Sequence, residues 1–298
     1  MTPGETVARV VAFESGEERG MGMVRDGRIH PLTKYVQAEF ADQITDLFYR
    51  DWANDQVDWR TGSGTVSLAE VTLLAPIRAT AKIMCQVVNY AEHGKEASIA
   101  PPSRPFFFLC PGSSVIGASE TILAHPQSAA LDFEVELAVV IGRAGRNISR
   151  EAALDHVGAL MVANDVSYRD LQFNRGFEDL NLRFGRNWTH GKGLDGSCVL
   201  GPWLTLVDSR AEAARPRTLQ CFVNGELRQS ASTDEMIFDV EELISAASQG
   251  MTLACGDILL TGTPAGVGLA DQRFLAPNDV VRSCIEGIGY AENSVAAV

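Results

Sequence analysis

Leu131-Asp-Phe-Glu-Val-Glu-Leu-Ala-Val-Val-Ile-Gly-Arg143 is the stretch that decides how the chain folds. As a β-strand it has a period of two, because successive side chains of a strand point to opposite faces. One face is apolar and contains Phe133, Val135, Leu137, Val139 and Ile141. The other face contains Asp132, Glu134, Glu136 and Ala138. The pattern predicts a strand with a hydrophobic core on one side and a row of carboxylates on the other.

The carboxylates of Glu134 and Glu136 have two interpretations. Side chains at positions i and i+2 of a strand lie roughly 6 to 7 Å apart, so both can reach one cation. Carboxylates beside a packed core are costly to leave unpaired, and a hard divalent ion with oxygen ligands would offset that cost. The alternative is the solvated polar face of an edge strand, which the Glu-x-Glu pattern alone favours.

The composition is that of an ordinary globular protein and argues against some partners. The 298 residues carry a net charge of −13, whereas nucleic acids and anionic membranes attract a basic surface. No stretch reaches the roughly 18 apolar residues of a membrane helix, and the start of the chain does not resemble a signal peptide. The six cysteines lack metal-binding spacing, which is typical of free thiols in a reducing compartment. We therefore expect a cytoplasmic protein without a nucleic-acid or membrane partner.

The first part of the chain has the pattern of a small unit that contains β-strands. A strand is predicted at Val7–Phe13, a turn at Asp26-Gly27, and a helix from about Thr33 to Trp52. Arg60-Thr-Gly-Ser-Gly-Thr65 is the best candidate for a linker. We place a domain boundary near residue 75, which divides the chain into a small N-terminal domain (1–75) and a larger second domain (76–298).

Strands interrupted by glycine and proline dominate after Lys82. Strands are predicted at Lys82–Val88, Leu160–Ala163 and Gly256–Thr261, and Asn224-Gly225 favours a type I′ hairpin turn. Helices are predicted to begin after Ser149 and after Asp239, which with Glu242 forms a capping-box pattern. Many short strands and few helices predict a β-rich α+β fold of the sandwich or roll type.

Three further segments contain candidate catalytic or binding residues. His93 and Glu96 share one face of a helical turn, where the carboxylate would make the imidazole a better general base. From these residues alone, an incidental pair on the surface is the more frequent outcome. Lys192 follows Trp188-Thr-His-Gly and is either a partner for an oxyanion or an ordinary surface lysine.

Asp165 ends a predicted strand, where it would be the third ligand of an ion that Glu134 and Glu136 also bind. Ser167 and Asp170 nearby have the pattern of a capping box. The Gly262–Gly268 loop offers backbone N–H groups and the Thr263 hydroxyl to a carboxylate or carbonyl oxygen. The loop lacks the Gly-Lys-Ser/Thr ending of a P-loop, which argues against nucleotide binding.

Taken in order, these segments resemble the fumarylacetoacetate hydrolase family, in particular its bacterial two-domain members that act on acylpyruvates and 2-oxo acids. The resemblance covers roughly residues 80 to 298 and rests on the combination of six motifs: Asn89–Glu96, Asp132–Gly142, Asn164–Gln172, Lys192–Pro202, Val223–Gln229 and Gly256–Gly268. The first 75 residues match only in containing a small β-rich domain.

The resemblance implies a mixed β-roll catalytic domain that is usually dimeric. It implies Mg2+ or Mn2+ bound by Glu134, Glu136 and Asp165, and a catalytic set of His93, Glu96 and Lys192. The positions that would contact a small oxo-acid substrate are Tyr90, Arg169, Gln172 and Thr263.

Three departures from the family pattern concern the substrate. Cys110 in Phe108-Leu-Cys-Pro111 stands where similar members have a basic residue. The stretch between Gln172 and Lys192 is longer than expected, and its Arg175, Arg183 and Arg186 would restore that charge or belong to a lid. Gly196-Ser197 replaces a threonine that the family often has after the lysine.

The function predicted from the sequence is metal-dependent hydrolysis of a carbon–carbon bond in a β-diketone or acylpyruvate-like acid. His93, oriented by Glu96, would activate the water, while Lys192 and Gln172 would stabilise the oxyanion. One alternative is decarboxylation or keto–enol tautomerisation of a 2-oxo diacid such as oxaloacetate. A second alternative, which the loss of a basic residue at Cys110 suggests, is a non-catalytic small-molecule binder.

Overall fold

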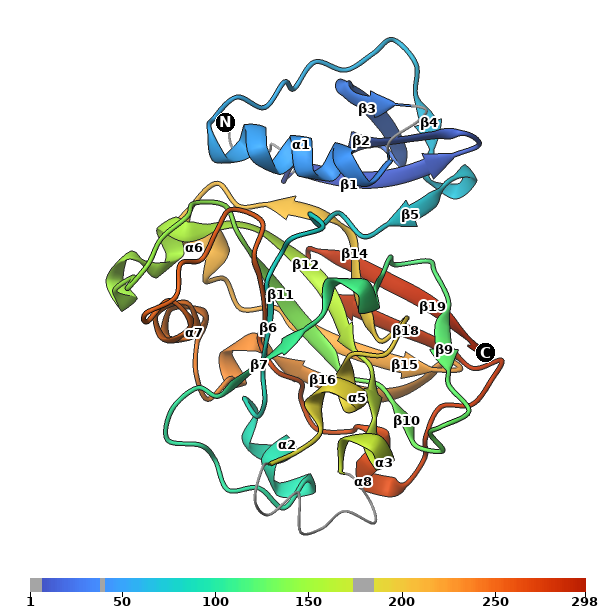
Figure 1. Ribbon diagram of the computed structural model, residues 1–298, viewed down its shortest axis with the longest axis vertical. Coiled ribbons are helices and arrows are strands. Elements are labelled where there is room, and N and C mark those ends of the chain that lie inside the picture. Colours follow the sequence, from blue (N-terminus) through green and yellow to red (C-terminus); the bar gives the residue numbers. More distant parts are fainter. Residues whose placement is uncertain (1–6, 38–40, 174–184) are drawn as a thin grey trace.

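The computed structural model describes residues 7–37, 41–173 and 185–298 (Figure 1). Its strands form a 12-stranded mixed sheet, a five-stranded sheet and a separate two-stranded ladder. Short helices cover the ends and edges of these sheets. The β-rich α+β fold predicted from the sequence is confirmed.

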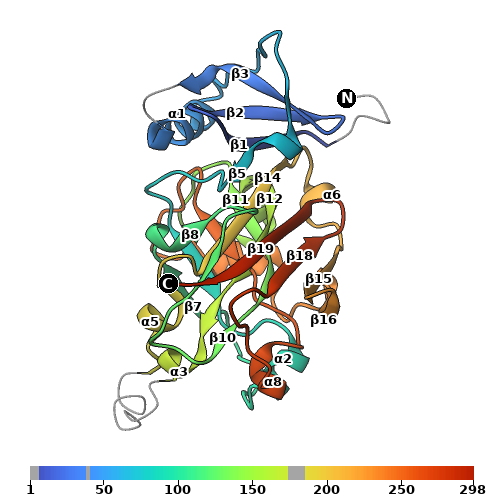
Figure 2. The same cartoon turned by 90° about the vertical axis from the view of Figure 1, so that its right-hand side faces the viewer.

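The N-terminal unit lies at one end of the molecule in both ribbon views (Figures 1 and 2). Its elements are β1 (Arg9–Ser15), β2 (Glu18–Arg25), β3 (Arg28–Gln37), α1 (Ala41–Ala53), β4 (Val66–Ser67), the 3-10 helix η1 (Leu68–Glu70) and β5 (Thr72–Leu74). The helix predicted from Thr33 begins only at Ala41. The preceding residues continue β3, where Val36 and Gln37 pair with Gly20 and Arg19 of β2. Pairing with a neighbouring strand has overridden the local helical pattern.

The large sheet joins the N-terminal unit to the rest of the chain. Its remaining strands are β6 (Ile83–Gln86), β7 (Phe107–Cys110), β8 (Val115–Ile116), β11 (Val135–Ile141), β12 (Val157–Asp165), β14 (Cys198–Leu206) and β17 (Ile258–Leu260). The main order is β4-β3-β2-β1-β14-β12-β11-β17-β6-β7, so the antiparallel pair β1–β14 links the two parts. The domain boundary near residue 75 stays a prediction.

The second sheet and the ladder complete the layers. The five-stranded sheet contains β9 (Ile122–Ala124), β15 (Thr218–Val223), β16 (Glu226–Ser232), β18 (Val280–Ile285) and β19 (Gly289–Ala297), and the ladder pairs β10 (Leu131–Asp132) with β13 (Ser167–Tyr168). The predicted hairpin turn is present between β15 and β16, where Asn224 and Gly225 both have positive φ angles, 50° and 81°.

Strand β11 lies between β12 and β17 in the sheet, and both of its faces are buried because each packs in a hydrophobic core. The face that contains Phe133, Val135 and Leu137 packs in the same core as residues of the second sheet. The opposite face, with Ala138 and Val140, packs in a core that includes residues of α1. The alternative of a solvated edge strand is therefore wrong. The carboxylates of Asp132, Glu134 and Glu136 are buried instead.

The remaining helices are short and connect the strands. They are α2 (Ala91–Glu96), η2 (Gly112–Ser114), η3 (Arg150–His156), α3 (Arg169–Gln172), α5 (Trp188–Lys192), α6 (Arg210–Ala213), η4 (Thr233–Glu235), α7 (Val240–Ala247) and α8 (Gly268–Asp271). Asp239 caps α7 as predicted, by accepting from the Glu242 N–H at 2.9 Å. The segment after Ser149 is a 3-10 helix, η3, and the Ser149 side chain does not cap it.

The predicted Ser167–Asp170 capping box is wrong. The Ser167 hydroxyl donates to the carbonyl of Asp165 at 3.2 Å, and the Asp170 carboxylate accepts from the Ala129 N–H at 2.8 Å. A carbonyl two residues earlier thus binds Ser167 and a distant segment binds Asp170, so the two side chains do not form the cap. All six cysteines are free, as predicted. Within the described ranges, no helix is long and apolar enough to cross a membrane.

Candidate metal centre and active site

The three predicted metal ligands meet at the end of the molecule that lies far from the N-terminal unit (Figures 1 and 2). Because β11 and β12 are antiparallel, the start of β11 lies beside the end of β12, and the Asp165 N–H donates to the carbonyl of Glu134 at 2.9 Å. Glu134, Glu136 and Asp165 each offer a carboxylate oxygen, and these oxygens lie within 4.8 Å of one another.

The donor set fits a hard divalent cation. All three carboxylates are buried, and Oδ1 of Asp165 has no hydrogen-bond partner within the described part of the chain. Burial, helped by the neighbouring carboxylates of Asp165 and Glu134, raises the pKa of Glu136 well above its ordinary value. Burial also raises the pKa of Asp165 to about 7, although Lys192 opposes the shift. A cation with oxygen ligands would remove this penalty, and Mg2+ and Mn2+ prefer such ligands.

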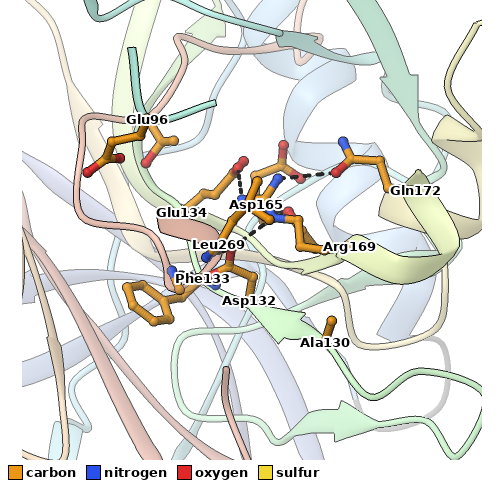
Figure 3. A network of polar contacts seen from close by, with 12 residues as sticks. Glu96, Ala130, Asp132, Phe133, Glu134, Asp165, Arg169, Gln172 and Leu269 are labelled. Atoms are coloured by element: carbon orange, nitrogen blue, oxygen red, sulfur yellow. Dashed lines mark hydrogen bonds and ion pairs between the residues drawn. The ribbon is translucent and has the colours of Figure 1, made fainter. Parts of the chain in front are cut away.

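Arg169 is the first of two buried cations beside the carboxylates. Figure 3 shows its guanidinium between Asp132, Glu134 and Gln172. It donates to Asp132 at 2.8 Å, to Glu134 at 2.5 Å and to the Gln172 side-chain oxygen at 3.2 Å. The predicted substrate contacts Arg169 and Gln172 are thus in place at the site, with Arg169 held by carboxylates and Gln172 held by Arg169.

Lys192 is the second buried cation. Its Nζ lies 2.5 Å from Glu134 Oε2 and 2.9 Å from Asp165 Oδ2, and it donates to the Asp165 carbonyl at 3.0 Å. Burial disfavours the ammonium, but the two carboxylates outweigh that effect and raise its pKa. Burial opposes the ionisation of Glu134, but Arg169 and Lys192 outweigh it and lower the pKa of Glu134 to about 2. Lys192 is therefore a charged hydrogen-bond donor rather than a base.

Asp132 is an anchoring residue that our reading of the sequence did not single out. It is fully buried and accepts from Arg169, and it also accepts from the N–H groups of Gly268 at 2.6 Å and Leu269 at 3.0 Å. It therefore fixes both Arg169 and the start of α8. The period of two already placed Asp132 on the same face as Glu134, which is the signal that could have identified it.

His93 and Glu96 lie together at the end of α2, as predicted. The imidazole is 5% exposed, and its Nδ1 lies 3.8 Å from Glu96 Oε2, which is longer than a hydrogen bond. Both oxygens of Glu96 accept from the Gly266 N–H at 3.0 Å. The loop after β17 thus orients the carboxylate, which in turn faces the histidine.

Tyr90 and Thr263 lie near the site but do not line its cavity. The Thr263 hydroxyl donates to the Val135 carbonyl at 2.9 Å and accepts from the Gln229 amide at 2.8 Å. The first of these hydrogen bonds holds the loop to β11. The Tyr90 hydroxyl is buried without a hydrogen-bond partner among the described residues. Substrate contact by Tyr90 and Thr263 stays a prediction.

A cavity of about 300 Å³ opens beside the carboxylates. The cavity is lined by polar groups of the site together with aromatic and aliphatic side chains. The polar residues include His93, Glu134, Asp165, Arg169, Gln172 and Lys192, and the apolar ones include Ile99, Phe106, Phe108, Trp188 and Leu269. Such a volume suits a small organic acid.

Three residues at which the sequence departs from the family pattern make contacts in the structure. The Cys110 thiol donates to the Lys192 carbonyl at 3.3 Å, and the Ser197 hydroxyl donates to the same oxygen at 3.1 Å. Both residues therefore hold the backbone that positions Lys192. Arg186 lines the cavity, with its guanidinium 4.0 Å from the centre of the Phe173 ring. Arg175 and Arg183 lie outside the described residues.

Known proteins are similar to this chain over most of its length. Human oxaloacetate tautomerase FAHD2A, mitochondrial, is 42% identical over 231 residues, which cover 76% of this chain and 70% of that protein. Oxaloacetate tautomerase YisK of Bacillus subtilis is 40% identical over 253 residues, which cover 82% and 79% of the two chains.

A solved structure has the same architecture and contains a metal. Fumarylpyruvate hydrolase from Pseudomonas aeruginosa, in complex with Mn2+ and pyruvate, is 30% identical with a TM-score of 0.66, over 76% of this chain and 92% of that one. The family model described as fumarylacetoacetate (FAA) hydrolase C-terminal matches residues 82–296. The chain therefore belongs to the fumarylacetoacetate hydrolase family.

Proposed function

We propose that this protein is a Mg2+- or Mn2+-dependent enzyme that interconverts the keto and enol forms of a 2-oxo diacid such as oxaloacetate. The observation that carries the proposal is the buried group of Glu134, Glu136 and Asp165, of which Glu134 and Asp165 line the same cavity as His93. Relatives at 40 and 42% identity named as oxaloacetate tautomerases support this choice over hydrolysis, which the sequence alone had favoured.

Glu134, Glu136 and Asp165 would hold the cation, since they supply three oxygen donors and an excess of negative charge. Four buried carboxylates, including Asp132, face two buried cations, Arg169 and Lys192. When these groups are ionised, two negative charges remain, which one divalent ion would neutralise. When bound, the ion supplies Lewis acidity toward the oxygens of an oxo acid.

The chain's own groups account for the proton transfer. Tautomerisation removes a proton from the carbon beside the 2-oxo group and adds a proton at the oxygen. The His93 imidazole lines the cavity and is the group that can take and return a proton there. Glu96 faces the imidazole at 3.8 Å and would orient it if the two groups approached to hydrogen-bonding distance. The Lys192 ammonium donates hydrogen bonds where negative charge develops on the oxygen, and its burial strengthens that interaction.

Decay of enol-oxaloacetate absorbance in the presence of Mg2+ or Mn2+ tests the proposal. Glu136→Gln and His93→Asn should each lower the enzymatic rate, whereas Glu92→Gln, an exposed change on the same helix as His93, should not. Full activity of Glu136→Gln in chelator-treated buffer would contradict the metal-dependent mechanism.

Hydrolysis of an acylpyruvate is the second candidate. The solved fumarylpyruvate hydrolase, similar over 76% of this chain, favours it, and a histidine that faces a carboxylate can also activate water. Product masses separate the two reactions. Hydrolysis yields pyruvate and a carboxylic acid, whereas tautomerisation in D2O exchanges a carbon-bound hydrogen and leaves the carbon skeleton intact. Homodimerisation and a cytoplasmic location stay predictions.

A further inference from the structure

A closed ring of hydrogen bonds includes Val135, the residue between the two glutamates of the candidate metal centre. The Val135 N–H donates to the side-chain oxygen of Gln229 at 3.1 Å. The Gln229 amide nitrogen donates to the Thr263 hydroxyl at 2.8 Å, and that hydroxyl donates to the Val135 carbonyl at 2.9 Å. The two peptide units that flank Val135 are therefore both held by this ring of three residues, which we call the Val135 ring.

The Val135 ring takes the place of strand pairing beyond the end of β17. In an antiparallel ladder, alternate residues of a strand bond to opposite neighbours. Thr261, which follows β17, still donates to the Leu137 carbonyl at 3.1 Å. Val135 directs its polar groups to the same side as Leu137, where Gln229 and Thr263 bind them instead of a strand. The backbone that carries the glutamates is thus fixed at this point by side chains.

Gln229 suits this position because an amide combines a donor and an acceptor. The residue is 1% exposed, and its amide nitrogen also donates to the Pro264 carbonyl at 2.8 Å. A backbone N–H can only donate and a carbonyl can only accept, so Val135 and Pro264 together require both kinds of atom. A carboxylate would supply no donor, and an apolar side chain would leave the Val135 N–H without this partner.

The loop that Gln229 holds also contacts a candidate metal ligand directly. The Gly262 N–H donates to Glu136 Oε2 at 2.7 Å. Further along the loop, Gly266 has a φ angle of 104° and lies so close to β16 that a Cβ there would overlap the Arg228 carbonyl oxygen. The loop therefore lies directly against β16 beside Gln229, and the place of the Gly262 N–H depends on that contact.

We propose that Gln229 is a positioning residue of the metal centre, which sets the geometry of Glu134 and Glu136 through the Val135 ring and the Gly262–Gly268 loop. The inference rests on the proposed function, which takes these glutamates as metal ligands. Gln229 itself does not line the cavity. It acts on the ion only through the residues that it holds, as groups that orient metal ligands do in general.

Calorimetric titration of Mn2+ without substrate tests the proposal by a readout other than turnover. Gln229→Met keeps the approximate length of the side chain and removes its hydrogen bonds. The Mn2+ dissociation constant of the folded variant should rise roughly 10- to 100-fold, the usual effect of replacing a group that orients metal ligands. An unchanged constant would overturn the proposal.

Asn293→Leu is the matched control. Asn293 is another amide that is 1% exposed, and it lies in β19 of the same sheet as β16. It donates to the carbonyls of Gly117 and Glu120 at 3.0 and 2.8 Å, and neither of these residues belongs to the candidate site. The control should therefore keep the wild-type dissociation constant in its folded fraction, measured by urea unfolding. An equal rise in Asn293→Leu and Gln229→Met would overturn the proposal.

Thr263→Val breaks the Val135 ring at another point and tests the proposal even if Gln229→Met does not fold. The Mn2+ dissociation constant should rise in Thr263→Val, and Thr263→Ser, which keeps the hydroxyl, should restore most of the affinity. The titrations contain no substrate, so the predicted contact of Thr263 with substrate does not affect them. Equal affinities of Thr263→Val and the wild-type protein, or of Thr263→Val and Thr263→Ser, would overturn the role of the ring.

The result is separable from a failure of the proposed function. Weaker Mn2+ binding in Gln229→Met, with a wild-type protein that does not turn over oxaloacetate, would overturn the tautomerase proposal and support the positioning role. Oxaloacetate turnover by the wild type, with equal Mn2+ affinities in all variants, would support the proposed function and overturn the positioning role. A wild-type protein that binds neither Mg2+ nor Mn2+ would overturn both.

Discussion

Two buried carboxylate regions on the same sheet differ in how their charge is compensated. Asp257, fully buried before β17, forms ion pairs with Arg78 and Lys82 and accepts from the Ala254 N–H at 2.7 Å. Burial opposes its ionisation, but these partners outweigh burial and lower its pKa. At the candidate metal centre, cations and N–H groups compensate the carboxylate charge only in part, and the pKa values of Glu136 and Asp165 are raised.

The difference separates a structural carboxylate from a ligand-binding one. The chain satisfies Asp257 by itself, so that nothing further is needed for a stable fold. It gathers three carboxylates around one point and leaves Oδ1 of Asp165 without a hydrogen bond from the described residues. Burial of uncompensated charge is unfavourable, and such sites are where functional groups concentrate. Four experiments test this comparison.

The largest effect should come from Glu136→Gln. We expect turnover to fall roughly 1,000-fold, since a cation supplies several kcal/mol of stabilisation to the reacting oxygens and loses a ligand here. The measurement is the rate of enol-oxaloacetate decay at saturating Mn2+. Asp257→Asn serves as the comparison and should retain turnover in its folded fraction. If Glu136→Gln lost less turnover than Asp257→Asn, the assignment of Glu136 to the active site and of Asp257 to a structural role would be wrong.

Addition of Mn2+ should stabilise the wild-type protein. At about 100 times the dissociation constant, the free energy of unfolding should rise by about 2.7 kcal/mol, because the ion binds the folded state alone. Urea denaturation with Mn2+ and with chelator gives the difference. Glu136→Gln should lose most of this gain while Asp257→Asn keeps it. The same gain in both variants would place the bound ion elsewhere.

Asp257→Asn should destabilise the protein by about 2 kcal/mol, less than for a fully buried pair because Arg78 and Lys82 are 21% and 32% exposed. Glu136→Gln, measured without metal, should be neutral or stabilising because it removes a carboxylate whose charge burial disfavours. Urea unfolding at neutral pH in chelator compares the two. If both variants lose stability equally, the carboxylate of Glu136 is compensated within the chain as well.

The smallest effect should be opposite pH dependences of stability. The pKa of Asp165 is raised from 3.8 to about 7, so its contribution is complete below pH 3.8 and is lost as the pH rises toward 7. The pKa of Asp257 is lowered, so its contribution is present above its ordinary pKa and is lost as the pH falls through the lower folded value. In chelator, Asp165→Asn should reduce the decline in urea midpoint across the first window, to which the raised pKa of Glu136 also contributes, and Asp257→Asn should leave the decline unchanged. An unchanged profile in Asp165→Asn would contradict the shift.

Much of the fold followed from local patterns. Alternation in Leu131–Arg143 correctly assigned opposite faces, and Asn224-Gly225 identified the hairpin because few residue pairs tolerate positive φ angles. The helix predicted from Thr33 was wrong at its start because β2 offered pairing partners distant in the sequence. The Ser167–Asp170 box was wrong because the Ser167 hydroxyl donates to the Asp165 carbonyl two residues earlier, whereas Asp170 accepts from Ala129, which is distant in the sequence.

The candidate site was only partly readable from the sequence. The three candidate metal ligands come together only if the end of β12 lies beside the start of β11. The resemblance of the motifs to a known family supplied that expectation. Asp132 was missed because its importance arises from Arg169 and Gly268, which come from other parts of the chain. The bonds of the Thr263 hydroxyl to Val135 and Gln229 could not be foreseen from the sequence either, and its contact with a substrate stays a prediction.

By itself, the sequence determined the periods of the elements, the acidic face of one strand and the membership of a family, because these depend on residue order alone. Only the tertiary structure decided that this strand is buried on both faces, which carboxylates are compensated, and where the cavity extends. Those properties depend on distances between segments far apart in the chain. Burial and charge pairing act through space, and the same glutamate is an ordinary surface residue or a ligand according to what packs around it.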